Sequence, residues 1–152
     1  FRSAEKAEWL GPAAEVMEIG SWDDGCLCLV ALEQKGFYTV SAKPCLGIFW
    51  KYINEHWNGY FPVESQARGW IWEEMIFGQT EEPDAAEVVC VVEGWKGQEN
   101  GWQEVGRYTI PVGENGFFSM VLDSSIPRSK DRTMKEIICK NAAGEVIAVE
   151  AQ

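Results

Sequence analysis

The sequence has no long apolar run, a single histidine and few basic residues for its length. Its longest uninterrupted apolar stretch, CLCLVAL at residues 26–32, spans seven residues, whereas a membrane-spanning helix needs about 20. We therefore expect no membrane span in this chain. Lys and Arg number 13 against 24 Asp and Glu, which gives a formal charge of -11. Because proteins that bind nucleic acid neutralise phosphates with clustered cations, we expect no nucleic-acid partner.

Familiar catalytic and cofactor motifs are also missing from the sequence. It contains no G-x-S-x-G, H-E-x-x-H, P-loop or G-x-G-x-x-G pattern, and a mechanism that needs histidine must use His56. His56 stands in the turn-like segment NEHWNGY, where a surface or packing role is favoured over a catalytic one. C-x-x-C pairs and histidine clusters do not occur either, so we expect no metal site and no cofactor.

The cysteines are odd in number, and most of them stand in apolar surroundings. All except Cys45 lie in strand-like runs, where a free thiol behaves as a small buried hydrophobic group. Cys26 and Cys28 would point to the same face of a strand, which is a poor geometry for a bond between them. Reduced core thiols are the favoured interpretation and one disulfide is the alternative. The full set is Cys26, Cys28, Cys45, Cys90 and Cys139.

Signals for β-strands dominate the rest of the chain. Runs rich in Val, Ile, Phe, Tyr and Trp alternate with turn segments such as DDG, EQKG, GENG and NAAG. In one run Tyr108, Ile110 and Val112 share a face, and Pro111 marks an edge or an end because it cannot donate a ladder hydrogen bond. The expected strands span residues 15–19, 26–33, 36–42, 46–53, 69–77, 86–93, 104–112, 116–122, 135–140 and 145–150.

About ten strands joined by short turns predict an all-β fold. We expect one domain over residues 1–152, an antiparallel β-sandwich of immunoglobulin-like type, with a barrel as the competing arrangement. A short N-terminal helix is expected in SAEKAEWLGPAAEVM, where Gly11 and Pro12 would end it. The best candidate for a break is GQTEEPDA, residues 78–85, between two sub-sheets. The predicted core includes Val89, Val91, Phe117, Met120, Ile138 and Ile147.

Tryptophan is the residue type in excess, with eight in the chain. Three of them, Trp50, Trp70 and Trp72, fall in expected strands and are assigned to the core. Five further aromatic residues, Phe61 included, fall in loop-like segments, where they either cap the ends of the sandwich, the favoured role, or stack on a flat ligand such as a sugar. Four of the five are candidate binding residues. These candidate binding residues are Trp57, Tyr60, Trp95 and Trp102.

The last two of these residues flank the polar segment KGQENG at residues 96–101. A hairpin closed by this segment would set Trp95 and Trp102 opposite each other near its base. Such a cross-strand aromatic pair stabilises a hairpin and leaves one ring face open to solvent. The capping role and the ligand role are therefore compatible at this pair.

Neighbouring carboxylates supply an alternative function. Glu73 and Glu74 follow the aromatic segment GWIW, and glycoside hydrolases place two carboxylates on either side of a sugar. Adjacent residues of one strand point to opposite faces, so these two could not act together. A structural role is favoured for both, and a carbohydrate-active enzyme is our second hypothesis behind a non-enzymatic binding module.

Three segments carry a resemblance to a known type of domain: IFGQTEEPDAAEVVCVV from Ile76, then RYTIPVGENGFFSMVL, then KEIICKNAAGEVIAVE. The order of an FG strand end, a PDA turn, a Val-rich strand, a GFF strand and an NxxGxVI hairpin resembles uncharacterised β-rich, lipoprotein-type domains of extracytoplasmic proteins in Gram-positive bacteria. The earlier KGFYTVSAKPCLGIFWKYINEHWNGYFPV is similar to the preceding part of such domains.

The resemblance implies a β-rich domain on the outer side of a membrane, and it supplies no catalytic or binding residues. The chain begins at Phe1 and not at methionine, so we expect any signal peptide or lipid anchor to lie upstream. Together these observations favour a non-enzymatic extracytoplasmic module that binds carbohydrate or another surface protein.

Overall fold

The computed structural model describes residues 15–21, 27–33, 36–46, 49–52, 59–62, 65–72, 75–122 and 132–152. In these ranges every regular element is a β-strand, apart from one 3-10 turn at Glu114–Gly116. The all-β prediction is therefore confirmed for the described residues, and none of them belongs to a helix long and apolar enough to cross a membrane. The expected N-terminal helix falls mostly on residues 1–14, outside the described residues. The chain divides into two compact units, Phe1–Pro62 and Val63–Gln152.

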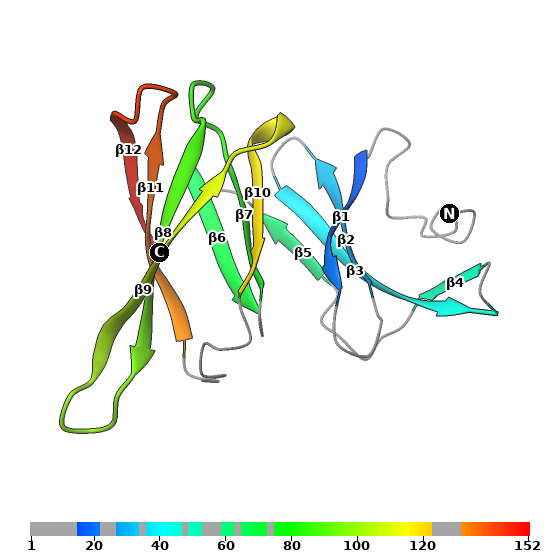
Figure 1. Cartoon of the computed structure of the whole chain (residues 1–152), viewed down its shortest axis with the longest axis horizontal. Coiled ribbons are helices and arrows are strands. Elements are labelled where there is room, and N and C mark those ends of the chain that lie inside the picture. The colour runs from blue at the N-terminus through cyan, green and yellow to red at the C-terminus, as the bar shows by residue number, and fades with distance from the viewer. Residues whose placement is uncertain are drawn as a thin grey trace. The chain divides into compact units, whose positions relative to one another are not determined.

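The first unit contains an antiparallel sheet in which sequence neighbours pair (Figure 1). Its long third strand, β3, pairs on one side with β2, and on the other side with β4 along residues 42–45 and with β5 along residues 36–39. The strand order is β1-β2-β3-β4, with β5 added to β3. The strands are β1 (Glu15–Ser21), β2 (Leu27–Glu33), β3 (Gly36–Cys45), β4 (Phe49–Tyr52) and β5 (Gly59–Pro62).

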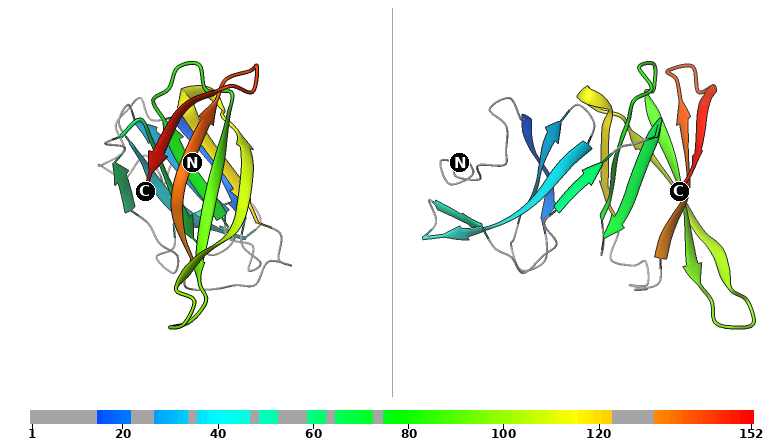
Figure 2. Two further views of the ribbon diagram at one scale, coloured as in Figure 1. Left: turned by 90° about the vertical axis from the view of Figure 1, so that its left-hand side faces the viewer. Right: turned by 180° about the vertical axis from the view of Figure 1, so that it is seen from behind.

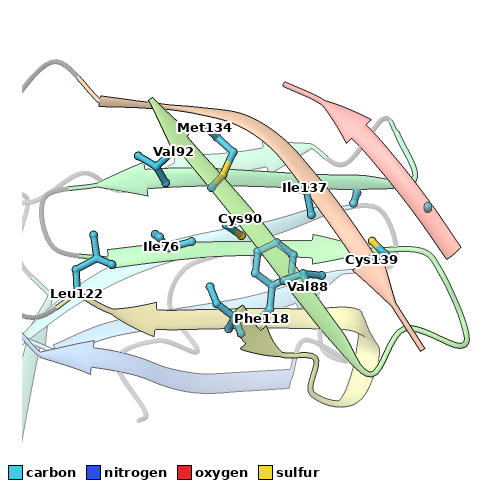
Figure 3. Close-up of a cluster of buried hydrophobic side chains, with 12 residues drawn as sticks. Ile76, Val88, Cys90, Val92, Phe118, Leu122, Met134, Ile137 and Cys139 are labelled. Carbon is cyan, nitrogen blue, oxygen red and sulfur yellow. The ribbon is translucent and has the colours of Figure 1, made fainter. Parts of the chain in front are cut away.

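The second unit contains two antiparallel sheets. One has the order β10-β7-β6 and the other the order β12-β11-β8-β9. Buried side chains from both sheets belong to a single apolar cluster, so the sheets face each other across a shared core (Figure 3). The strands are β6 (Ala67–Trp72), β7 (Met75–Thr80), β8 (Glu87–Trp95), β9 (Trp102–Pro111), β10 (Phe117–Val121), β11 (Arg132–Lys140) and β12 (Val146–Ala151).

The shared core is built by alternate residues of the central strands, since successive side chains of a strand point to opposite faces. From the four-stranded sheet, Val88 and Cys90 of β8 and Ile137 of β11 are fully buried (Figure 3). From the three-stranded sheet, Ile76 and Phe118 meet them. This core fixes which face of β8 and β9 is turned outward, and that face carries the candidate site.

The predicted core residues are only partly confirmed. Val89, Val91 and Phe117 are buried, and Ile138 is half-buried. The prediction is wrong for two residues, because Met120 is 38% exposed and Ile147 is 36% exposed. Both stand on edge strands, β10 and β12, where a side chain has a neighbouring strand on one side only.

The expected strand at residues 69–77 is in fact two strands. β6 ends at Trp72 and β7 begins at Met75, and these two residues are opposite each other in an antiparallel pair. No glycine or proline marks the break, so a turn could not be predicted there from residue type. Trp70 of β6 is half-buried, against our assignment to the core, and stacks on Phe77 with 6.4 Å between ring centroids. The side chains of Trp50 and Trp72 lie outside what the structure describes.

The segment at residues 78–85, where we placed a break, ends β7 and leads to β8. It thus passes from one sheet of the second unit to the other. The boundary between the two compact units falls earlier, between Pro62 and Val63, after an aromatic stretch that we expected to be a loop. Part of that stretch is strand β5, which pairs with β3.

Two further expectations about β9 are confirmed. β9 is an edge strand that ends at Pro111, and its residues Tyr108 and Ile110 pack on the core while Arg107 and Thr109 are exposed.

The thiols of Cys90 and Cys139 are free and buried, as predicted, and Cys45 is free and exposed. Burial raises the pKa of Cys90 to about 12, and the neighbouring Cys139 adds to the shift. Such a thiol stays protonated and unreactive at neutral pH. Cys28 lies on β2, and Cys26 lies outside the described residues.

Candidate functional site

The candidate site lies on the hairpin formed by β8 and β9, whose turn extends past the other strands of the second unit (Figures 1 and 2). The turn is closed by a hydrogen bond from Lys96 N to Gly101 O of 2.9 Å. Inside it, Gly101 N donates to Gly97 O, also at 2.9 Å. Both glycines have positive φ, 93° at Gly97 and 62° at Gly101, a conformation that costs other residues steric strain. The KGQENG segment thus folds as a tight, well-bonded turn.

Trp95 and Trp102 stand directly opposite each other at the base of this turn. Their ring centroids are 5.7 Å apart and the ring planes meet at 64°, an edge-to-face contact. Because the next pair, Lys96 and Gly101, is hydrogen-bonded, the tryptophans occupy a non-hydrogen-bonded pair, where opposing side chains come closest. Trp95 is 42% exposed and Trp102 is 47% exposed. The predicted cross-strand pair is confirmed, and substantial surface of each residue remains open to solvent.

Charged side chains border the two rings on the outward face of the sheet. Stepping two residues from each tryptophan along its strand leads to Glu93 and Glu104, which are opposite each other. Like charges so placed repel, and each carboxylate is matched by a cation. Lys135 Nζ lies 2.8 Å from Glu93 Oε1, and Arg107 binds both oxygens of Glu104, at 2.8 and 3.0 Å.

The ion pair with Arg107 favours the charged form of Glu104. The hydrogen bond from Arg107 lowers the pKa of Glu104, and the hydrogen bond to Glu93 raises the pKa of Lys135. An ionised carboxylate accepts hydrogen bonds but has no proton to donate. The rings are therefore bordered by acceptors suited to hydroxyl and amide groups, and Glu104 is a poor general acid.

The other predicted site residues are not joined to this pair by any described contact. Trp57 lies outside the described residues, as do His56, Glu73 and Glu74. Tyr60, expected in a loop, lies on strand β5 opposite Tyr38, and its side chain is not among those described. Among the candidates, the described part of the chain brings together Trp95 and Trp102.

Sequence reasoning missed the charged border of the rings. Glu93 and Glu104 could have been found by counting two residues from each tryptophan, since side chains alternate along a strand. Arg107 is hidden from such a count by a register shift in the β8–β9 pair next to Glu93. Lys135 reaches the site because β11 pairs with β8, a long-range pairing with no local signal.

The described residues include no group of three or more His, Cys, Asp or Glu side chains that could hold a metal ion. The arrangement suits contact with a ligand: two partly open aromatic rings with ionised groups beside them. Comparisons with protein families, with curated proteins and with solved structures yielded no match to this chain.

Proposed function

We propose that this chain is a non-enzymatic, extracytoplasmic binding module and that the Trp95–Trp102 pair is its contact surface for carbohydrate. The observation that carries the proposal is the exposure of both residues, 42% and 47%, at a position where their edge-to-face contact already orders them. Rings held in place before binding lose little side-chain freedom on contact, which favours affinity.

The second unit is, in this proposal, an immunoglobulin-like sandwich. Seven strands divided between sheets in the orders β10-β7-β6 and β12-β11-β8-β9 support this assignment. In that class the third, sixth and seventh strands share a sheet, as β8, β11 and β12 do, and the first, second and fifth strands share the other. The fourth strand, β9, pairs with the third, which makes the Trp-bearing hairpin an extension of the larger sheet.

Carbohydrate is the ligand class that fits the chemistry of the site. The C–H face of a sugar ring packs on an aromatic face, and its hydroxyl groups donate to ionised carboxylates such as Glu93 and Glu104. Lys135 and Arg107 supply donors for sugar oxygens. The ionised state of Glu104 also supports a binding role over a hydrolytic one at this site, because glycoside hydrolysis needs a carboxylic acid that donates a proton.

Retention on carbohydrate tests the proposal. The full chain and the variants Trp95→Ala and Trp102→Ala are applied to a panel of glycans and cell-wall polymers, with Val105→Ala as the matched control. Val105 lies on the same hairpin and is 37% exposed, so its variant removes exposed apolar surface without touching the rings. We expect the parent and Val105→Ala to be retained on at least one polymer, and both Trp variants to lose at least tenfold in affinity, about 1.4 kcal/mol.

A parent chain that no polymer retains would contradict the carbohydrate proposal. Earlier unfolding of both Trp variants in that case would assign the rings a capping role alone, worth about 0.2–1 kcal/mol for the cross-strand pair. The extracytoplasmic location rests on the sequence resemblance and is tested separately, by protease accessibility of the natural protein on intact cells.

A further inference from the structure

β12 is an outer strand of the sheet that carries the candidate site, and most of its exposed side chains are apolar. In Figures 1 and 2 this strand lies at one margin of its sheet, beside β11. Its sequence, VIAVEA, has no lysine, arginine or proline. Val146 is 56% exposed and Val149 is 55% exposed, the largest exposures of any valine in the described residues. Exposed apolar edges are the strands that pair with another chain.

Two other outer strands of the second unit, β9 and β6, carry features that discourage such pairing. β9 has the charged residues Glu104 and Arg107 and a terminal Pro111, each of which blunts an edge. A register shift does not distinguish β9, because β12 also has one at Ile147. The side chain of Gln152 occupies backbone hydrogen-bonding groups at the start of β6. Its Nε2 donates to Ala67 O at 3.1 Å, and its Oε1 accepts from Gly69 N at 3.2 Å. No comparable contact is described along β12.

The hydrogen bonds of β12 show which of its backbone groups face the open edge. Gln152 N donates to Lys135 O at 2.9 Å, and the register continues with Ala151 opposite Glu136 and Val149 opposite Ile138. Hydrogen-bonded pairs alternate with non-bonded pairs in an antiparallel ladder. The N–H and C=O groups of Val149 and Ala151 therefore point away from β11, toward the free side.

We propose that β12 pairs antiparallel with β12 of a second copy of this chain, centred on Val149. In this register each Val149 faces Val149 of the other copy and exchanges two backbone hydrogen bonds with it. Each Glu150 faces Ala148, so no two glutamates are opposed. The regular part of the strand is residues 148–151, because Ile147 is skipped in the pairing of β12 with β11. A register centred on Glu150 would instead set two glutamates opposite each other, which is unfavourable.

The paired edge would join two four-stranded sheets into one continuous sheet with a two-fold axis, the commonest symmetry of homo-oligomers. A strand of six residues offers a small interface compared with the standard of about 1,600 Å². We therefore expect a weak dimer whose population rises with protein concentration. Two copies would carry two Trp95–Trp102 pairs, which would strengthen binding to a repeating polymer by avidity if the proposed function holds.

Cysteine cross-linking tests the register directly. Val149→Cys and Val146→Cys are each made in a Cys45→Ser background, which removes the thiol that is exposed among the described cysteines. A hydrogen-bonded antiparallel pair has Cα atoms about 5.5 Å apart, within the range of a disulfide. The two Val146 positions would be separated by about 20 Å along the strands. Since both valines are equally exposed, the variants differ in register and not in accessibility.

We expect mild oxidation to convert Val149→Cys into a covalent dimer of twice the 17.1 kDa chain mass and to leave Val146→Cys monomeric. Equal cross-linking of both variants, or none in Val149→Cys, would overturn the proposal. Sedimentation supplies the second measurement: the parent and the β9 variant Val105→Lys should gain average mass with concentration, and Val149→Lys should not. A parent that stays at 17.1 kDa up to its solubility limit would refute self-pairing whatever its affinity for carbohydrate.

Discussion

Gly78 lies at a crowded backbone position of the second unit, and replacing it with alanine should destabilise this unit strongly. Phe118, Gly78 and Gly69 stand side by side across three strands, and the Phe118 ring covers both glycines. A Cβ atom on Gly78 would overlap Arg68 O and the Phe118 ring, and would lie 2.8 Å from Gly69 Cα. Two of these three neighbours are backbone atoms of β6.

The loss of stability in Gly78→Ala depends on whether the neighbouring atoms can move away from the added Cβ. Phe118 is 1% exposed, so its ring has no free volume to enter, and the β6 backbone can retreat only by parting from β7. Overpacking costs about 1–3 kcal/mol and occasionally more. We expect Gly78→Ala to reach or exceed the upper figure, about 3 kcal/mol. Gly69→Ala is the matched control, because its nearest neighbours are the side-chain ends Ile137 Cδ1 at 3.0 Å and Met134 Cε at 3.3 Å, which can shift. It should cost about 1 kcal/mol.

The assay is a denaturant titration of the full chain followed through amide signals of β7 and β8 by NMR, so that unfolding of the second unit is read alone. A double variant, Gly78→Ala with Phe118→Leu, should lose less stability than the sum of its single changes, because part of the overlap involves the ring. Gly78→Ala within about 0.5 kcal/mol of the parent, the range of surface substitutions, would refute the packing described here.

Three further predictions concern the thiols and the Gln152 contact. Alkylation of the native chain should label Cys45 and spare Cys90 and Cys139 until the protein unfolds, as read by peptide mass spectrometry; fast native labelling of Cys90 would contradict its burial. Because folding raises the pKa of Cys90 from 9.0 to about 12, the thiol ionises at lower pH in the unfolded chain, and the free energy of unfolding should fall by about 1.4 kcal/mol per pH unit between these values. In denaturant titrations at several pH values, Cys90→Ala should lose stability less steeply with pH than the parent. The same pH dependence in both proteins would exclude Cys90 as its cause. Gln152→Ala should cost about 0.5–1.5 kcal/mol through the lost bonds to β6, whereas an unchanged unfolding midpoint would show that water replaces them.

The β8–β9 hairpin was predictable because its signals are local. Alternation assigned the faces of residues 107–110 of β9 correctly, Pro111 marked the end of the strand, and the glycines of KGQENG supplied the positive φ values that the turn requires. The opposition of Trp95 and Trp102 followed from the symmetric spacing about that turn. Local chemistry and global fold agree here, so a sequence argument suffices.

Elsewhere the decisive interactions are non-local. The run from Gly69 to Phe77 looked like one strand, and only its pairing across Trp72 and Met75 reveals the hairpin. Strand β5 forms because β3 offers it an edge, although GYFP has weak strand character of its own. Lys135 joins the site through the pairing of β11 with β8. None of these strand pairings can be recognised from a short window of sequence.

The most direct test of the proposed contact surface is an NMR titration of the indole N–H signals with the polymer that retains the chain best. Trp95→Phe and Trp102→Phe identify the two signals among those of the eight tryptophans. The account predicts that these two signals, and backbone amides of β8 and β9 beside Glu93 and Glu104, shift together as polymer is added and saturate with one affinity. Shifts confined to other tryptophans, or no shift of either assigned indole under conditions of retention, would contradict it.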